Sequence, residues 1–192
     1  MPQFIDIHTH NPRPDVLSPT MAGVHPWDAE RGVALPELSA ADIVGETGLD
    51  FVCDVSREAQ EQLFRQHLEA AERLNKPVVL HVVRSFERVM SILNGYTLAG
   101  VIFHGFIGSL HQARRCVERG YYLSFGARSI RSPRTREVIA TLPHHLLFIE
   151  TDDALSPSIE ELYVAIAELR KEDVEELKKQ LLENYNRLII KR

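Results

Sequence analysis

Short apolar runs alternate with longer amphipathic segments along this chain, and that alternation restricts its fold more than any other feature of the sequence. The apolar runs cover residues 4–8, 20–25, 42–47, 77–83, 100–106, 121–126 and 146–152. Most of them are continuously apolar, as strands are when both faces of their sheet are covered. Seven such strands separated by helices predict parallel pairing, in an α/β barrel or a doubly wound sheet.

The segments between the runs carry the start and stop signals of helices. The candidate N-caps are Ser56, Ser109 and Ser158. The first of these helices is expected to run to about Asn75, and the second to end at Gly120. No linker or internal repeat divides the chain, and its 192 residues, 44% of them hydrophobic, suit a single domain over residues 1–192.

One connection is too short for this pattern. Residues 11–19 separate the first two apolar runs and include Pro12, Pro14 and Pro19. A crossover between parallel neighbours needs about a dozen residues or more, and proline disrupts the interior of a helix. The first strand–helix unit is therefore predicted to be irregular or missing.

The charge balance and the lack of long apolar runs limit the partners. There are 22 lysines and arginines against 27 aspartates and glutamates, and the net charge of −5 gives no overall attraction to nucleic acid or to an anionic membrane. The N-terminus has no signal-peptide pattern, and no apolar run approaches the roughly 20 residues that span a bilayer. We therefore expect a cytoplasmic protein with no membrane partner. Cys53 and Cys116 form no redox or metal-binding pair, and Cys116 is expected in the core.

Polar side chains gather at or just after the predicted strand ends. They are His8, His10, His25, Glu46, His81, His104 and Asp152. His8 and His10 leave the same face of an extended segment, because strand side chains repeat with a period of two. In such folds the carboxyl ends of the parallel strands lie at the same end of the barrel or the same edge of the sheet. Side chains from six runs are therefore expected to converge there.

A convergent cluster of this composition favours metal binding. One histidine at a strand end is ordinarily a hydrogen-bonded structural residue, but five histidines and two carboxylates together would be costly without a ligand. One or two divalent metal ions would remove that cost. The remaining histidines, which lie in or beside predicted helices and are expected to be structural, are His67, His111, His144 and His145.

Short motifs give the chain a resemblance to a known family. They are DIHTH, GVHPW, GETGLDF, KPVVLH, FHGFIGS, YLSFG and LFIETDD. Their order and spacing resemble those of the TatD family of metal-dependent hydrolases, also called TatD-related deoxyribonucleases, from Phe4 to about Leu188. The resemblance implies a TIM-type metallo-dependent hydrolase barrel with two adjacent divalent ions.

The resemblance also implies roles for individual residues. One ion would be bound by His8, His10 and Asp152, the second by His81 and His104, and both by a bridging Glu46. A shared carboxylate is chemically sensible because it lowers the repulsion between two neighbouring cations. His25 matches a family histidine near the site, with either a substrate-binding or a structural role, and Asp50 is a candidate orienter of a ligand histidine.

The chain departs from the family pattern in several places. Family members are longer, and the missing residues fall largely between His10 and His25. Arg84 stands one place later than the family arginine, which leaves its contact with phosphate open. Asp153 directly follows Asp152, and strand alternation lets only one of the two carboxylates face inward.

The leading functional hypothesis is a phosphodiesterase or deoxyribonuclease. A metal pair lowers the pKa of a bound water toward about 7, so no serine or cysteine nucleophile is needed. Asp152 is the expected general base, and Glu46 is the other expected catalytic residue. Arg128 and Arg131 follow the predicted strand at 121–126, where they either bind phosphate or belong to a solvated helix start.

Other functions and several metals stay open. The same type of site also hydrolyses carboxylic esters, lactones and amides, and a non-catalytic binding protein is a third hypothesis that the complete ligand set disfavours. Histidine and carboxylate ligands suit Zn, Mn, Fe or Ni, and a bridged site also takes Mg. The expected substrate is a phosphoester, with DNA among the candidates.

The short connection also has a structural consequence. With seven strand candidates, one strand of an eight-stranded barrel is predicted to be absent, which leaves an incomplete barrel of about seven strands with the metals at their carboxyl ends. An open edge exposes unpaired backbone groups, and the proline-rich residues 11–19 are well placed to cover it. A homodimer formed across the gap is a further expectation.

Overall fold

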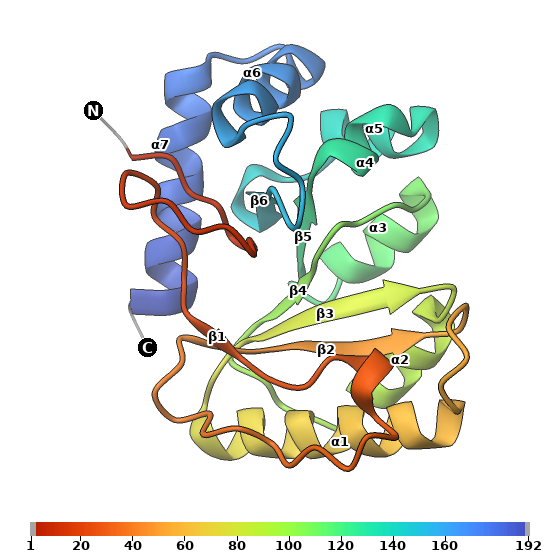
Figure 1. The fold of residues 1–192 in the computed structure, drawn as a ribbon. Helices are drawn as coiled ribbons and strands as arrows, with labels where there is room; N and C mark the ends of the chain where they lie inside the picture. Colours follow the sequence, from red (N-terminus) through yellow and green to blue (C-terminus); the bar gives the residue numbers. More distant parts are fainter. Residues whose placement is uncertain (1–2, 191–192) are drawn as a thin grey trace. The chain divides into compact units, whose positions relative to one another are not determined.

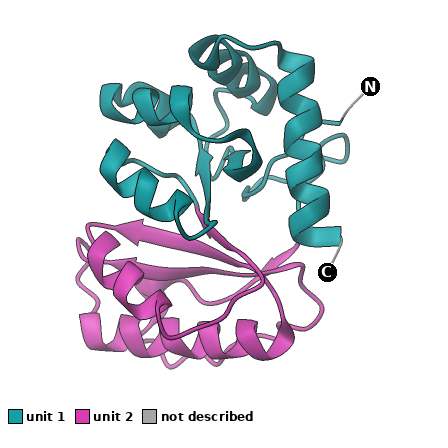
Figure 2. Cartoon of the chain, turned by 180° about the vertical axis from the view of Figure 1, so that it is seen from behind, with its two compact units in different colours: residues 1–19, 104–192 teal, residues 20–103 magenta. Residues whose placement is uncertain are grey.

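The structure is a computed structural model that describes residues 3–190 (Figure 1). The described chain forms two compact units (Figure 2). Unit 1 comprises residues 3–19 and 104–190, and unit 2 comprises the uninterrupted residues 20–103. Within residues 3–190, no helix combines the length and the apolar character that crossing a membrane would require.

Unit 2 is built on parallel strands. In chain order its elements are β1 (Met21–Ala22), the 3-10 helix η1 (Pro26–Asp28), β2 (Ile43–Asp50), α1 (Arg57–Leu74), β3 (Val78–Val83), α2 (Phe86–Leu93) and β4 (Val101–Phe103). The strands pair in the order β1-β2-β3-β4, all in parallel, and α1 packs against β2. The predicted parallel pairing is therefore confirmed for these runs.

The boundaries of α1 follow from its capping residues. Ser56 Oγ accepts a hydrogen bond from the backbone N–H of Ala59 at 3.1 Å. Asn75 ends the helix in the left-handed conformation, with φ of 51°. Both predicted ends of this helix are confirmed.

His67 is a buried structural histidine on the inner face of α1, as predicted. Its Nε2 accepts a hydrogen bond from the backbone N–H of Val24 at 2.9 Å, and its Nδ1 lies 2.8 Å from the carbonyl oxygen of Leu63. Burial lowers the pKa of His67, so the neutral ring is favoured. The ring thereby ties α1 to the segment that precedes His25.

Unit 1 is discontinuous in the sequence and holds the remaining elements. They are α3 (Leu110–Val117), β5 (Tyr122–Phe125), α4 (Ala127–Arg131), α5 (Pro133–Thr141), the 3-10 helix η2 (His144–Leu146), β6 (Leu147–Ile149), α6 (Ile159–Arg170), α7 (Val174–Tyr185) and the π-helix η3 (Asn186–Ile190). β5 and β6 pair in parallel, and α7 packs against β6 and α6. Ser109 and Ser158 both form capping boxes, which confirms these two predicted helix starts.

The first apolar run, residues 4–8, is extended but is not a regular strand. Its Asp6 N–H donates to the carbonyl of Leu17 at 3.0 Å, whereas its Ile7 N–H donates to the carbonyl of Ile149 at 3.1 Å. Only isolated parallel bridges form on the two sides. Residues 3–190 therefore contain six strands instead of the predicted seven, because this run makes no continuous ladder with either neighbour.

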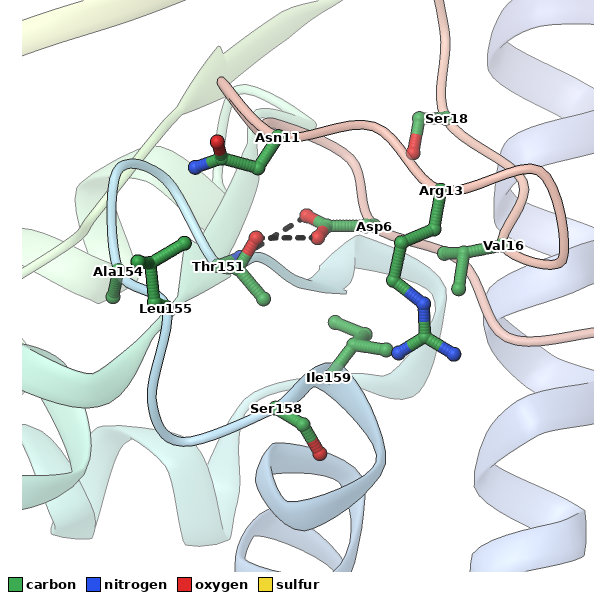
Figure 3. Close-up of a pocket in the computed structure, with 10 residues that line it drawn as sticks. All are labelled: Asp6, Asn11, Arg13, Val16, Ser18, Thr151, Ala154, Leu155, Ser158 and Ile159. Carbon is green, nitrogen blue, oxygen red and sulfur yellow. Dashed lines mark hydrogen bonds between the residues drawn. The ribbon is translucent and has the colours of Figure 1, made fainter.

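The proline-rich residues 11–19 pair with one edge of this run. The Leu17 N–H donates to the carbonyl of Phe4 at 2.9 Å, and Ile5 and Leu17 form a parallel bridge. This segment borders a cavity of about 240 Å³. Figure 3 shows the residues that line it, which are Asp6, Asn11, Arg13, Val16, Ser18, Thr151, Ala154, Leu155, Ser158 and Ile159. The segment thus supplies backbone partners to an edge that would otherwise be open, as the sequence predicts.

Candidate metal centre

Each unit contains a triad of candidate ligands whose ligating atoms lie within 4.8 Å of one another. The unit 1 triad is His8, His104 and Asp152, and the unit 2 triad is His25, Glu46 and His81. Imidazole nitrogens combined with carboxylate oxygens form a donor set that suits a divalent ion such as Zn or Mn. Both triads therefore fit a metal ion.

Backbone pairing places Asp152 between two histidines in unit 1. The Asp152 N–H donates to the carbonyl of His8, and the His10 N–H donates to the carbonyl of Asp152. Asp152 Oδ1 then lies 3.4 Å from His8 Nε2 and 3.5 Å from His10 Nε2. The ring of His104 lies 4.4 Å from that of His8, between centroids. Asp152 is thus the aspartate among these histidines, while Asp153 is exposed.

A buried glutamate that we did not single out from the sequence orients His104. Glu150 is 1% exposed, and its Oε1 lies 3.2 Å from His104 Nδ1. Its other oxygen accepts a hydrogen bond from Ser124 Oγ. A carboxylate partner on Nδ1 selects the tautomer in which Nε2 acts as the metal ligand. The available signal was an acidic residue directly after an apolar run and two places before Asp152.

Asp6 is a second buried carboxylate that supports unit 1 (Figure 3). Its Oδ1 accepts from the Thr151 N–H at 3.0 Å, and its Oδ2 accepts from the Thr151 hydroxyl at 2.6 Å. Burial raises the pKa of Asp6 to about 6, although the hydrogen bonds from Thr151 act in the opposite direction. These bonds tie the run that carries His8 to the segment that carries Asp152.

The unit 2 triad is arranged around one carboxylate oxygen. Glu46 Oε1 lies 2.7 Å from His81 Nδ1 and 3.5 Å from His25 Nε2. The other nitrogen of His25, Nδ1, accepts a hydrogen bond from the Trp27 N–H at 3.3 Å, which turns Nε2 toward Glu46. His25, predicted to have a substrate-binding or structural role, therefore lies among the candidate ligands.

Glu46 and His81 lie inside strands, which corrects the prediction that they stand at strand ends. β2 continues to Asp50, and it stays paired with β3 beyond both side chains. The register of β2 on β3 shifts between Val44 and Thr47, and such irregularities change the direction of a side chain. A polar residue inside a strand interrupts the apolar pattern and is easily mistaken for the end of the strand.

Gly48 allows β2 to approach the backbone of His81. The two residues are paired in register, and Gly48 has φ of +140°. A Cβ at this position would lie 2.1 Å from the carbonyl oxygen of His81, a distance that no side chain can occupy. The second glycine of the GETGLD motif therefore supports the position of a candidate ligand.

Asp50 lies on the far side of His81 from Glu46. Asp50 Oδ2 is 3.4 Å from His81 Nε2 and accepts a hydrogen bond from Trp27 Nε1 at 2.8 Å, while Oδ1 accepts from the Val52 N–H at 2.8 Å. Burial acts to raise the pKa of Asp50, but the hydrogen bonds from Trp27 and Val52, with that of His81, hold it below its usual value. An ionised Asp50 beside Nε2 directs Nδ1 of His81 toward Glu46.

The three arginines proposed for substrate contact are all exposed. Arg84 follows β3 and adopts a left-handed conformation with φ of 48°. Arg128 and Arg131 lie within α4, which agrees with a helix start at this place. Contact of these side chains with phosphate stays a prediction.

Comparison with known proteins agrees with this geometry. A family model described as TatD related DNase matches residues 7–190. The chain belongs to the TatD family. The uncharacterized metal-dependent hydrolase YabD of Bacillus subtilis is 35% identical to it over an alignment 194 residues long. The alignment covers 86% of this chain and 75% of YabD. The 3'-5' ssDNA/RNA exonuclease TatD of Shigella flexneri is 36% identical over 145 residues, covering 68% of this chain and 56% of that protein.

The fold of the TatD family is also found among solved structures. The crystal structure of YJJV, a TatD homologue from Escherichia coli, matches with a TM-score of 0.77 at 24% identity and covers 98% of each chain. The predicted fold class, a shortened TIM-type α/β barrel, is thereby confirmed. The number of ions, the bridging role of Glu46, the single-domain organisation and the homodimer stay predictions.

Proposed function

We propose that this member of the TatD family is a metal-dependent phosphodiesterase that hydrolyses single-stranded nucleic acid. The observation that carries the proposal is the pair of histidine and carboxylate triads, one in each unit. A ligand histidine in each triad has its own buried carboxylate partner, Glu150 for His104 and Asp50 for His81. Such partners orient metal ligands and raise their basicity.

The donor atoms of the two triads suit hydrolytic chemistry. Divalent ions held there would lower the pKa of a bound water toward about 7 and neutralise charge on a phosphoryl group. We assign the role of general base to Asp152, because its side chain is 29% exposed and is held between His8 and His10. The exonuclease named among the relatives supports a nucleic-acid substrate for this chain.

Metal reloading combined with a substrate panel tests this function. Protein stripped of metal and reloaded with Mg, Mn or Zn is assayed on single-stranded DNA, an aryl phosphodiester and an aryl carboxylic ester. We expect metal-dependent cleavage of the phosphodiesters, abolished in Asp152→Asn and His81→Ala. His111→Ala serves as the matched control, because His111 is an exposed histidine on α3 outside both triads.

The outcomes separate the competing functions. Hydrolysis of the carboxylic ester alone would replace the phosphodiesterase with an esterase. Binding of metal without turnover of any substrate would favour a non-catalytic binding protein. Full activity of Asp152→Asn would show that Asp152 is not the general base. A loss of activity in Asp153→Asn but not in Asp152→Asn would assign that role to Asp153.

A further inference from the structure

We propose that Trp27 is a stacking platform for a base of the bound nucleic acid, beside the unit 2 triad. The inference rests on the proposed phosphodiesterase function and adds to it a residue that selects the substrate. Trp27 is the single tryptophan of the chain and is 55% exposed. Indole contributes a large apolar area when it is covered, so a ring left exposed next to candidate metal ligands is well suited to contact a ligand.

The indole is held in one orientation. Its Nε1–H donates to Asp50 Oδ2 at 2.8 Å. Its ring stands edge-on to the rings of His25 and His81, with centroid distances of 4.5 Å and 5.9 Å. A side chain that is already ordered loses little conformational entropy when a ligand covers it. Trp27 is therefore preorganised for stacking, unlike a mobile surface side chain.

Val52 is a second exposed apolar residue bonded to Asp50, and we call Trp27 and Val52 together the apolar ledge. Val52 is 60% exposed, and its backbone N–H donates to Asp50 Oδ1 while Trp27 occupies Oδ2. Two exposed apolar residues are thus held by the two oxygens of one carboxylate, Trp27 through its indole N–H and Val52 through its backbone N–H. The π-face of a nucleobase would cover such a ledge without requiring a particular hydrogen-bond pattern.

Cations flank the end of β2 that follows Asp50. The guanidinium of Arg57 lies over the ring of Phe51, 4.4 Å from its centroid. The Phe51 N–H donates to the carbonyl of Val83 at 2.9 Å, which sets Arg84, the next residue, beside the same strand end. Exposed arginines next to aromatic rings form the combination that binds the backbone and bases of single strands.

A protein partner explains this surface less well. A stable interface buries roughly 800 Å² on each partner and has a continuous apolar centre. The ledge has two exposed apolar residues, Trp27 and Val52, too few for such an apolar centre, and Arg57 follows a few residues later in the chain. Single-stranded nucleic acid is therefore the occupant that we propose.

The single tryptophan makes a direct test possible. Fluorescence of the full chain, loaded with Mn, is recorded while a short phosphorothioate oligothymidylate that resists hydrolysis is added. An abasic strand of the same length and charge serves as the ligand control. We expect the oligothymidylate to quench the emission of Trp27 and the abasic strand to leave it largely unchanged.

Variants extend the test to affinity, measured by anisotropy of a labelled oligothymidylate. Trp27→Ala should weaken binding about tenfold or more, and Trp27→Phe should retain most of the affinity because it keeps an aromatic face. Val33→Ala is the matched control, since Val33 is another exposed apolar residue of unit 2, and its affinity should stay within about twofold of wild type. In turnover assays, Trp27→Ala should raise KM for DNA more than it lowers kcat.

The results distinguish this inference from the proposed function. Equal quenching by both strands, or wild-type affinity of Trp27→Ala, would overturn the stacking role even if the protein cleaves DNA. Emission that depends on protein concentration instead of on the strand would overturn it in favour of contact between copies. Base-dependent quenching in a protein that hydrolyses no phosphoester would support stacking and refute the proposed hydrolysis.

Discussion

Replacing Tyr163 by phenylalanine should destabilise the protein, because one hydroxyl satisfies both backbone groups of Ile5. Tyr163 lies on α6 and has no exposed area. Its hydroxyl donates to the Ile5 carbonyl at 3.1 Å and accepts from the Ile5 N–H at 3.1 Å. Burial raises the pKa of Tyr163, so the neutral hydroxyl that can make both bonds is present at all ordinary pH values.

The magnitude follows from the two groups that would lose their partner. A buried N–H or C=O left without a hydrogen bond costs about 1–3 kcal/mol, and Tyr163→Phe keeps the ring in place, so the two groups together predict a loss of about 2–6 kcal/mol in the free energy of unfolding. With a slope of about 1–3 kcal/mol per molar urea, the unfolding midpoint should fall by roughly 1 M or more. Circular dichroism during urea titration measures this change.

A matched control and a second measurement make the test sharper. Tyr96→Phe removes the hydroxyl of a half-buried tyrosine in unit 2 and should change the unfolding free energy by no more than about 0.5 kcal/mol. Because Ile5 belongs to the run that carries His8, Tyr163→Phe should also weaken binding of Mn. Wild-type stability of Tyr163→Phe would refute the pairing of the hydroxyl with Ile5 and the reasoning built on it.

Further changes probe the residues that support the ligands. Asp50→Asn replaces an acceptor by a donor facing His81 Nε2, so isothermal calorimetry should show about 10- to 100-fold weaker Mn binding; unchanged affinity would remove Asp50 as an orienter. Glu150→Gln should lower metal affinity by a similar factor of about 10 to 100 and change the tautomer of His104 seen by NMR, and an unaltered tautomer would contradict the assignment. Because burial lowers the pKa of His67, the unfolded chain takes up a proton that the folded chain resists, so stability should fall as pH drops below about 6.5. The slope of stability against pH should be shallower in His67→Gln, and an identical slope would exclude His67 as its source.

Local signals in the sequence were sufficient where the determinants of an element lie close together in the chain. α1 is predicted at both ends because Ser56 and Asn75 are its own capping residues. Candidate ligands were recognisable because several histidines and carboxylates follow apolar runs, and the motifs of the TatD family strengthened that interpretation. Seven polar residues were predicted to converge at the strand ends. The structure places six of them in the two triads and the seventh, His10, beside Asp152.

Features that depend on distant partners were not visible in the pattern. The pattern of the first run predicts a strand, but its hydrogen bonds go to Leu17 on one side and to Ile149 on the other. No local feature of the sequence indicates that its bonds are divided between two partners. Glu150 was overlooked because an acidic residue after an apolar run reads as a strand end, while its burial depends on Ser124 and His104. Tertiary contacts determine the structure of the first run and the burial of Glu150, and hydrophobic periodicity does not depend on such contacts.

The discontinuity of unit 1 imposes an order on the maturation of the protein during synthesis. Unit 2 is one uninterrupted stretch, residues 20–103. Its complete triad therefore leaves the ribosome before residues 104–190 of unit 1 have all been synthesised. The run that carries His8 has to wait for Ile149 and Tyr163, which at about 5–20 residues per second is a delay on the order of ten seconds. During that interval the apolar N-terminal run lacks the partners that later bury it. The first candidate ligands to be translated, His8 and His10, are therefore among the last to be held in place.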